Sequence, residues 1–202
     1  MLIGPKYKIC KRLGASVFEK CQTQKFQLAE ARAPRKTPRR RGGSDFGLQL
    51  LEKQKARFTY GLSESQFSRY VHEAMEKKGK DSALGLLSRL ESRLDNVVYR
   101  AGFVKTRRAA RQMVSHGHIL INGRRVNIPS FKVEKEMLVS IRPESRPSAL
   151  FVNRTETTAE TKAPAWLAFE DQGFAVRVVA DPGLGEGEAP FSAPVIIQFY
   201  SR

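Results

Sequence analysis

Apolar residues recur at three- and four-residue spacing in two stretches of the first half of the chain. The first stretch begins at Ser44 and the second runs from residue 63 to about 78, and this spacing is typical of amphipathic helices. Ser63, followed three residues later by Gln66, has the side chains of a capping box, and Gly79 stands where a helix C-cap is expected. The pattern therefore predicts two consecutive helices.

The clearest helical pattern lies between residues 86 and 101, where apolar side chains trace a single face that Gly102 ends. It predicts one continuous helix. Thr106 is then the expected N-cap of a shorter helix, which ends at His116-Gly117 and has small apolar residues on its inner side. The two helices should form a compact pair that is similar to a helix-turn-helix.

Strand signals follow directly after the short helix. Residues 118–121 and 124–127 flank Asn122-Gly123, a dipeptide that favours the positive φ angles of a type I′ turn, so they predict a β-hairpin. Residues 138–141 predict a further strand. After Pro143 the chain becomes polar and rich in threonine, which indicates an exposed connection.

An ordered tail begins at Trp166-Leu167, and residues 174–179 and 195–200 in it are predicted strands. The segment 181–187 between them is rich in glycine. It carries acidic residues and has no Lys or Ser after the glycines, so we interpret it as a turn and not as a phosphate cradle.

These elements predict an α+β protein in which a small module is inserted in a mainly helical body. Residues 1–90 would form a basic N-terminal loop and a helical RNA-binding domain. Residues 91–150 would form a module of two helices and a small sheet. Residues 151–202 would form a tail that contains strands and packs back on the N-terminal domain.

The chain has 36 Lys and Arg against 20 Asp and Glu, a net charge of +16, and this excess lies before residue 150. Such a field favours a polyanionic partner. An anionic membrane is the alternative, but no apolar run approaches the ~18 residues of a spanning helix. Residues 1–6 reach a Gly-Pro pair before any long apolar segment, so we expect no secretory signal and a cytoplasmic protein.

Catalytic and metal chemistry find little support in the residue pattern. Cys10 and Cys21 lack the paired spacing and the nearby His of a zinc site, and a reducing compartment favours two unpaired thiols. His72, His116 and His118 have no triad-like or metal-ligand spacing, and the last two bracket a helix end, where capping is a more ordinary role than a ribonuclease pair. We expect no metal, no cofactor and no enzyme activity.

Basic side chains gather around the short helix. Backbone N–H groups at a helix start favour phosphate oxygens, and Arg adds planar bidentate donors. The cations expected to converge there are Arg93, Arg100, Lys105, Arg107, Arg108, Arg111, Arg124 and Arg125. Asp95 lies among them and is interpreted as an ion-pair partner, not as a general base. Because few aromatic residues accompany the arginines, folded RNA is a better fit than splayed single strands.

A second basic segment spans residues 33–43 and combines two prolines, two glycines and five cations. This composition predicts an open loop. Taken alone, such a charge run fits a solvated surface as well as a binding site. The rest of the chain lowers the weight of the solvated-surface interpretation.

A resemblance to a known family rests on residues 93–100, Gly102, Thr106-Arg107, residues 110–112, Val114, Gly117-His118 and residues 126–130. They look like the RNA-binding module first defined in the small-subunit ribosomal protein S-four. Pseudouridine synthases, tyrosyl-tRNA ligases and heat-shock RNA binders share that module. Residues 44–55, Tyr60-Gly61, Gln66-Phe67 and Tyr70 further resemble the N-terminal domain found only in the ribosomal family, and the likeness covers nearly the whole chain.

The resemblance implies a structural constituent of the small ribosomal subunit, bacterial or organellar, that binds the 5′ domain of small-subunit ribosomal RNA at a multi-helix junction and nucleates assembly. It also implies contact with ribosomal protein S-five at an interface tied to decoding accuracy. The loop with Arg39, Arg40 and Arg41 would line the channel through which mRNA enters, beside ribosomal protein S-three.

The expected RNA-binding residues come from both domains. They are Lys6, Lys8, Arg12, Arg39, Arg40, Arg41, Lys53, Lys55, Arg57, Arg69, Arg93, Arg100, Lys105, Thr106, Arg107, Arg108, Arg111, His116 and Arg124. The chain departs from the family at three places: Cys10 and Cys21 cannot reproduce the zinc-binding cysteine cluster of some members, residues 135–137 replace a Pro-Gly-Asp turn, and the acidic segment 181–188 is unlike the usual tail.

Two alternatives use the same cations differently. An RNA-modifying enzyme with the module as a targeting arm would need a separate catalytic domain, and the chain holds no stretch for one. A DNA-binding helix-turn-helix regulator would normally have a dimerisation element and base-reading Asn or Gln at the helix start. Competition between folded ribosomal RNA and duplex DNA at matched salt separates these alternatives.

Overall fold

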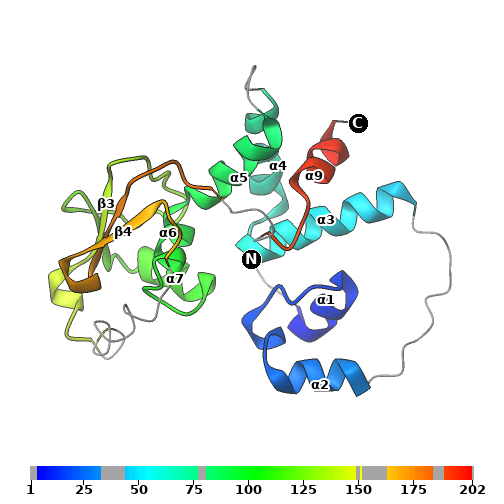
Figure 1. Cartoon of the computed structure of the whole chain (residues 1–202), viewed down its shortest axis with the longest axis horizontal. Helices are drawn as coiled ribbons and strands as arrows, with labels where there is room; N and C mark the ends of the chain where they lie inside the picture. Colours follow the sequence, from blue (N-terminus) through cyan, green and yellow to red (C-terminus); the bar gives the residue numbers. More distant parts are fainter. Residues whose placement is uncertain are drawn as a thin grey trace. The chain divides into compact units, whose positions relative to one another are not determined.

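The computed structural model describes residues 4–32, 44–76, 81–148, 151, 163–183 and 189–201 (Figure 1). The chain divides into two compact units, one of Met1–Leu86 with Gly185–Arg202 and the other of Leu87–Leu184. Helices occur in both units, and a five-stranded antiparallel sheet lies in the second. The predicted α+β class is confirmed.

The N-terminal stretch forms helix α1 (Lys6–Leu13), a 3-10 turn η1 (Glu19–Cys21) and helix α2 (Gln24–Arg32), none of which the sequence pattern predicts. These short elements pack around a small core that also includes Phe58 from the next helix. Its buried members are Cys10, Leu13, Phe18, Cys21, Phe26 and Phe58. Helices this short gain most of their stability from such packing, not from local propensity.

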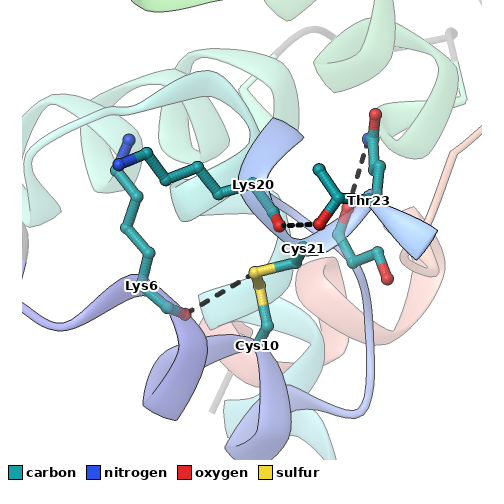
Figure 2. Close-up of a disulfide and its surroundings, with 7 residues drawn as sticks. Lys6, Cys10, Lys20, Cys21 and Thr23 are labelled. Carbon is teal, nitrogen blue, oxygen red and sulfur yellow. Dashed lines mark hydrogen bonds between the residues drawn. A yellow bond between two sulfur atoms is a disulfide. The ribbon is translucent and has the colours of Figure 1, made fainter. Parts of the chain in front are cut away.

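Cys10 and Cys21 form a disulfide inside this core (Figure 2). Both side chains are buried, and their Cα atoms lie 6.8 Å apart because the chain reverses between α1 and η1. The prediction of two unpaired thiols is therefore wrong. The spacing of the two cysteines does not reveal this reversal.

Helix α3 (Asp45–Tyr60) and helix α4 (Glu64–Met75) confirm the first two predicted helices. Ser44 caps α3, and the Ser63 hydroxyl accepts a hydrogen bond from the Gln66 N–H at 3.3 Å, which is one half of the predicted capping box. The Gln66 side chain donates to the Tyr70 hydroxyl instead of to the cap. The predicted C-cap at Gly79 lies outside the described residues.

The predicted strand at residues 195–200 is wrong, because this segment is helix α9 (Ala193–Tyr200), which packs on α3 and α4 (red in Figure 1). The Ser192 N–H donates to the Glu52 carboxylate at 2.7 Å, and the Tyr200 hydroxyl donates to Glu64 at 2.9 Å. The spacing of residues in a short apolar run cannot distinguish a helix from a strand. The packing of residues 195–200 on other helices therefore determined their conformation.

The predicted continuous helix over residues 86–101 is broken into α5 (Ser82–Glu91) and α6 (Leu94–Arg100). Arg93 is extended at the break and forms a β-bridge with Lys132. A distant loop supplies the backbone partners: the Leu94 N–H donates to the Phe131 carbonyl, and the Val133 N–H donates to the Ser92 carbonyl. These long-range bonds end α5, although the apolar spacing continues across the break.

Helix α7 (Arg107–Ser115) follows, capped by Thr106 as predicted. The strands are β1 (Ile119–Ile121), β2 (Arg124–Arg125), β3 (Leu138–Ile141), β4 (Leu167–Glu170) and β5 (Ala175–Val178), in the order β2-β1-β3-β5-β4. The hairpin is confirmed, with φ of 48° at Asn122 and 79° at Gly123. Apolar residues of α6, α7 and the sheet share one core.

Strands β4 and β5 extend the sheet of the module through the pairing of β5 with β3, in which Val176 lies opposite Val139. Short 3-10 turns, η2 (Pro143–Ser145) and η3 (Asp171–Gly173), flank these strands. Residues 163–183 thus belong to the second unit, where they add two strands to the sheet. Trp166, Leu167, Val176 and Val178 are buried in the same core as the module, whereas the stretch with α9 belongs to the first unit. The threonine-rich segment lies outside the described residues.

Candidate nucleic-acid interface

Helix α7 begins with a cap and a group of arginines. The Thr106 hydroxyl accepts the Ala109 N–H at 3.0 Å, which satisfies one of the unpaired N–H groups at the helix start. Ala110, Met113 and Val114 are buried, and they turn the basic side of the helix away from the core. This end of α7 combines backbone donors with guanidinium groups, a combination that favours phosphate.

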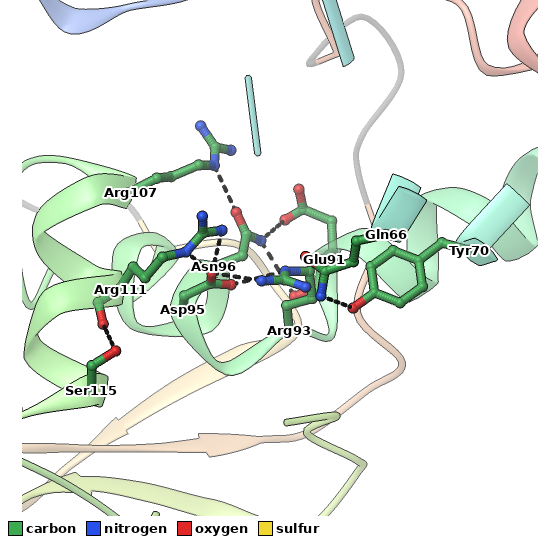
Figure 3. Close-up of polar contacts among 9 residues, drawn as sticks. All are labelled: Gln66, Tyr70, Glu91, Arg93, Asp95, Asn96, Arg107, Arg111 and Ser115. Carbon is green, nitrogen blue, oxygen red and sulfur yellow. Dashed lines mark hydrogen bonds and ion pairs between the residues drawn. The ribbon is translucent and has the colours of Figure 1, made fainter. Parts of the chain in front are cut away.

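The carboxylate of Asp95 joins two arginines from different elements (Figure 3). Arg93 donates from Nε to Oδ1 at 3.0 Å and from NH2 to Oδ2 at 2.8 Å. Arg111 of α7 donates from Nε and NH2 to Oδ2 at 2.9 and 2.8 Å. The interpretation of Asp95 as an ion-pair partner is confirmed, and the pair fastens α7 to the start of α6.

A second buried acid, Glu91, organises the other end of this network. It accepts the Arg100 Nε at 2.8 Å and the Asn96 Nδ2 at 2.9 Å. The Asn96 Oδ1 in turn accepts the Arg107 Nε at 2.8 Å, and the Arg107 guanidinium lies 4.3 Å from the centre of the Tyr99 ring. Sequence reasoning missed Glu91, Asn96 and Tyr99, because their role depends on the break between α5 and α6.

The expectation that Arg93 presents its charge on the polar side of a long helix is wrong. Its side chain is 2% exposed, and the Asp95 carboxylate compensates its charge inside the unit. Arg93 therefore lies inside the unit, where it shares the Asp95 carboxylate with Arg111 of α7. Arg100 is 20% exposed and pairs with the buried Glu91, so its charge is also compensated within the unit.

The remaining predicted cations of this unit lie on its surface. Lys105, Arg108 and Arg124 are exposed, as is His116, the C-cap residue of α7. Arg125, beside Arg124 on β2, donates to the His116 carbonyl at 3.2 Å. Positive charge is therefore placed at both ends of α7, and the hairpin contributes to one of them.

Predicted cations of the first unit fall into two groups. Lys8 and Arg12 are exposed on α1, and Lys6 is half-buried with its ammonium 5.6 Å from the Phe18 ring centre. Arg69 on α4 is exposed and lies 3.6 Å from Glu73. These residues are accessible to a partner.

The three cations of α3 are instead engaged within the unit. Lys53 is 9% exposed and pairs with Glu64 at 2.6 Å, Lys55 pairs with Glu52 at 2.6 Å, and Arg57 lies 3.4 Å from Glu64. Lys53 and Arg57 join α3 to Glu64 of α4, and Lys55 pairs within α3. Their positive charges compensate the carboxylates of Glu52 and Glu64 in this unit.

Glu64 carries a perturbed pKa at this junction. Burial raises the pKa, but hydrogen bonds from Lys53 and Tyr200 and the charge of Arg57 outweigh it, so the carboxyl has a pKa below its ordinary 4.5. Burial and the bond to Glu64 raise the pKa of the Tyr200 hydroxyl above its ordinary value. The ionised carboxylate and the protonated phenol are therefore mutually stabilising.

Metal-ligating side chains and histidines are the other candidate groups in the described parts of the chain. No group of three or more His, Cys, Asp and Glu side chains there could hold a metal ion. His118 Nδ1 lies 2.9 Å from the Ser145 hydroxyl, and the ring centres of His116 and His118 lie 6.1 Å apart. No helix in these parts is long and apolar enough to cross a membrane. Arg39, Arg40 and Arg41 lie outside the described residues.

Family comparisons match almost the whole chain. Residues 1–91 match the ribosomal protein S4/S9 N-terminal domain, and residues 92–139 match the S4 domain. The small ribosomal subunit protein uS4 of Roseiflexus castenholzii is 46% identical, with 99% of this chain and 98% of that protein covered. Those of Chloroflexus aurantiacus and Persephonella marina are each 42% identical, over 99% and 98% of this chain and 98% of each relative. The chain therefore belongs to the family of the small ribosomal subunit protein uS4.

Proposed function

We propose that the protein is a primary binder of small-subunit ribosomal RNA, with the start of α7 as its central contact. The observation that carries this proposal is the capped helix start with Arg107, Arg108 and Arg111, which lies within the residues that match the S4 domain. Its relatives are structural ribosomal proteins and not enzymes. The protein would act by holding RNA, without making or breaking a bond.

Phosphate neutralisation supplies most of the affinity in this mechanism. Arg107 and Arg108 lie in the first turn of α7, where N–H groups and the helix dipole add to their charge. Arg111 lies one turn further, and the exposed Lys105 precedes the cap. A cluster of this kind follows the backbone shape of folded RNA.

Exposed cations on α1 support a second contact on the helical unit. Lys8 and Arg12 are exposed on that helix, and Arg69 is exposed on α4. Exposed cations on both units would give the chain more than one contact with a folded RNA. This arrangement fits a multi-helix junction in the 5′ domain better than a single duplex, and binding there early would let the protein nucleate subunit assembly.

Further contacts follow from the family resemblance. The basic loop with Arg39, Arg40 and Arg41 would line the channel through which mRNA enters, beside ribosomal protein S-three. Contact with ribosomal protein S-five would tie the chain to decoding accuracy. The charge of the loop and its place between α2 and α3 in the sequence support the first of these roles.

Competition binding tests the proposed function. The full chain is titrated with a labelled transcript of the 5′ domain of small-subunit ribosomal RNA, against unlabelled transcript and against duplex DNA of equal length at the same salt. We expect the transcript to compete far more strongly than the duplex. Equal competition would contradict rRNA recognition and would favour a DNA-binding regulator.

Co-sedimentation tests the place of the protein in the subunit. Small ribosomal subunits from its own cell are pelleted through a high-salt cushion. A primary binder embedded in rRNA should remain with the subunits, whereas a loosely attached factor should be released. Complete subunits that lack the chain would contradict a structural role.

A further inference from the structure

We propose that Asn96 is a positioning residue that fixes the direction in which Arg107 presents its guanidinium group to RNA. This inference rests on the proposed function, and it assigns a role to a residue that does not itself reach the surface. Asn96 is 1% exposed, and its Oδ1 accepts the Arg107 Nε at 2.8 Å (Figure 3).

The orientation of the Asn96 amide is determined by its buried neighbour. Its Nδ2 donates to the Glu91 carboxylate at 2.9 Å and to the Glu91 backbone carbonyl at 3.3 Å. Both of these partners only accept hydrogen bonds, so the NH2 group must face them and the carbonyl oxygen must face away. That oxygen is therefore available to Arg107 in a fixed direction.

Arg107 is held at two points. Asn96 fixes its Nε, and the Tyr99 ring lies 4.3 Å below the guanidinium, which restrains the plane of the group. Bidentate recognition of a phosphate depends on the direction of that plane. A side chain ordered before binding loses less conformational entropy when RNA binds.

The residue type at position 96 matters because the site needs a donor and an acceptor together. Aspartate would lose the donor and place a second carboxylate beside Glu91. Alanine would remove the bond to Arg107 and one donor to Glu91. Asparagine satisfies both neighbours without adding charge.

Arg108 provides a matched control in the same turn of α7. It is exposed, and no ion-pair partner for its side chain occurs among the described residues. Its charge is the same as that of Arg107, but its direction is not fixed. The two arginines therefore separate the effect of charge from the effect of orientation.

A double-mutant cycle on RNA affinity tests the inference. The full chain and the variants Asn96→Ala, Arg107→Ala and the double variant are titrated with the 5′-domain transcript, and thermal unfolding of each is measured separately. Because ordering a mobile arginine side chain on binding costs up to about one decade of affinity, Asn96→Ala should weaken binding by up to about tenfold in the parent. It should have little further effect once Arg107 is alanine.

The outcomes distinguish the two proposals. If Arg107→Ala leaves the affinity unchanged, the proposed interface at α7 is wrong. If Arg107→Ala weakens binding but Asn96→Ala weakens it equally in both backgrounds, the interface stands and the positioning role is wrong. Asn96→Ala is also expected to lower thermal stability, because the side chain is buried. The RNA affinities, and not the unfolding temperatures, therefore decide between the outcomes.

Charge-conserving variants decide the question if Asn96→Ala fails to fold. Lysine keeps the charge but lacks the guanidinium plane and its Nε donor. Arg107→Lys should lose about tenfold in affinity, while Arg108→Lys should lose much less, because only Arg107 has an oriented plane to lose. Equal losses at the two positions would overturn the positioning role.

Discussion

Arg93 and Asp95 form a two-point ion pair inside the second unit, with Nε to Oδ1 at 3.0 Å and NH2 to Oδ2 at 2.8 Å. Both side chains are almost fully buried. Breaking a buried pair leaves an uncompensated charge, which usually costs about 3 to 5 kcal/mol. The first effect of this pair is therefore on the stability of the module, and not on RNA binding.

We predict that Asp95→Ala lowers the free energy of unfolding by about 3 to 5 kcal/mol, because it breaks the buried ion pair with Arg93. Denaturant unfolding of the full chain measures the loss. Glu144→Ala is the control, since Glu144 pairs with Arg142 at an exposed position and such a pair is worth about 0 to 1 kcal/mol. A loss at Asp95 no larger than that of the control would contradict a stabilising role for the buried pair.

We predict that reducing the disulfide between Cys10 and Cys21 destabilises the N-terminal core of the first unit by about 2 to 4 kcal/mol. The cross-link limits the unfolded chain over a separation of 11 residues. Thermal unfolding with and without reductant measures the effect, and the variant Cys10→Ser with Cys21→Ser is the control that should no longer respond. Two reactive thiols in the denatured, unreduced protein would show that the pair is not formed.

Stability of the helical unit should fall in acid through Glu64. Its pKa is depressed in the folded protein, so its contribution is present above the ordinary value of 4.5 and is lost as pH falls through the lower folded value. Unfolding measured between neutral pH and pH 3 should show this loss, and Glu64→Gln should reduce it. An unchanged acid limb in that variant would rule out Glu64 as its source.

The stability of the helical unit should also fall at high pH, through the Tyr200 hydroxyl. Its pKa is raised in the folded chain, so the stability it supplies is complete below the ordinary value and decreases as pH rises through it. Tyr200→Phe should remove this alkaline decrease while leaving α9 in place. Glu64→Gln and Tyr200→Phe each change one partner of the same hydrogen bond. Comparing them separates the acid effect of Glu64 from the alkaline effect of Tyr200.

Local sequence signals predicted the parts of the interface that depend on neighbouring residues. Thr106 predicted the start of α7, and Asn122-Gly123 predicted the hairpin turn, because a cap and a tight turn are determined by adjacent side chains. The arginines of α7 were therefore placed correctly at the start of a helix.

Long-range contacts determined the parts that the sequence did not predict. The break at Arg93 depends on backbone bonds from residues 131 and 133, and the burial of its charge follows from that break. The segment 195–200 is helical because it packs on α3 and α4. The pairing of Cys10 with Cys21 depends on the reversal between two short elements.

The basic loop gives a prediction about translation. Replacing Arg39, Arg40 and Arg41 with Ala should slow translation through structured messages and leave subunit assembly largely intact, because the loop would touch mRNA and not the rRNA framework. Translation of messages with and without a stable hairpin measures this. Ala at Lys132, Lys135 and Arg142 removes the same charge elsewhere as a control. Normal passage of the loop variant through hairpins would refute the role.

The salt dependence of binding to the 5′-domain transcript tests phosphate neutralisation most directly. For the full chain, the logarithm of the binding constant should fall by about 0.7 to 0.9 per phosphate contact for each decade of salt. Replacing Arg107 and Arg111 with Ala should lower that slope by about two contacts, while Lys132→Ala with Lys135→Ala should leave it unchanged. An affinity independent of salt, or a slope that Arg107 and Arg111 do not affect, would contradict phosphate neutralisation at α7.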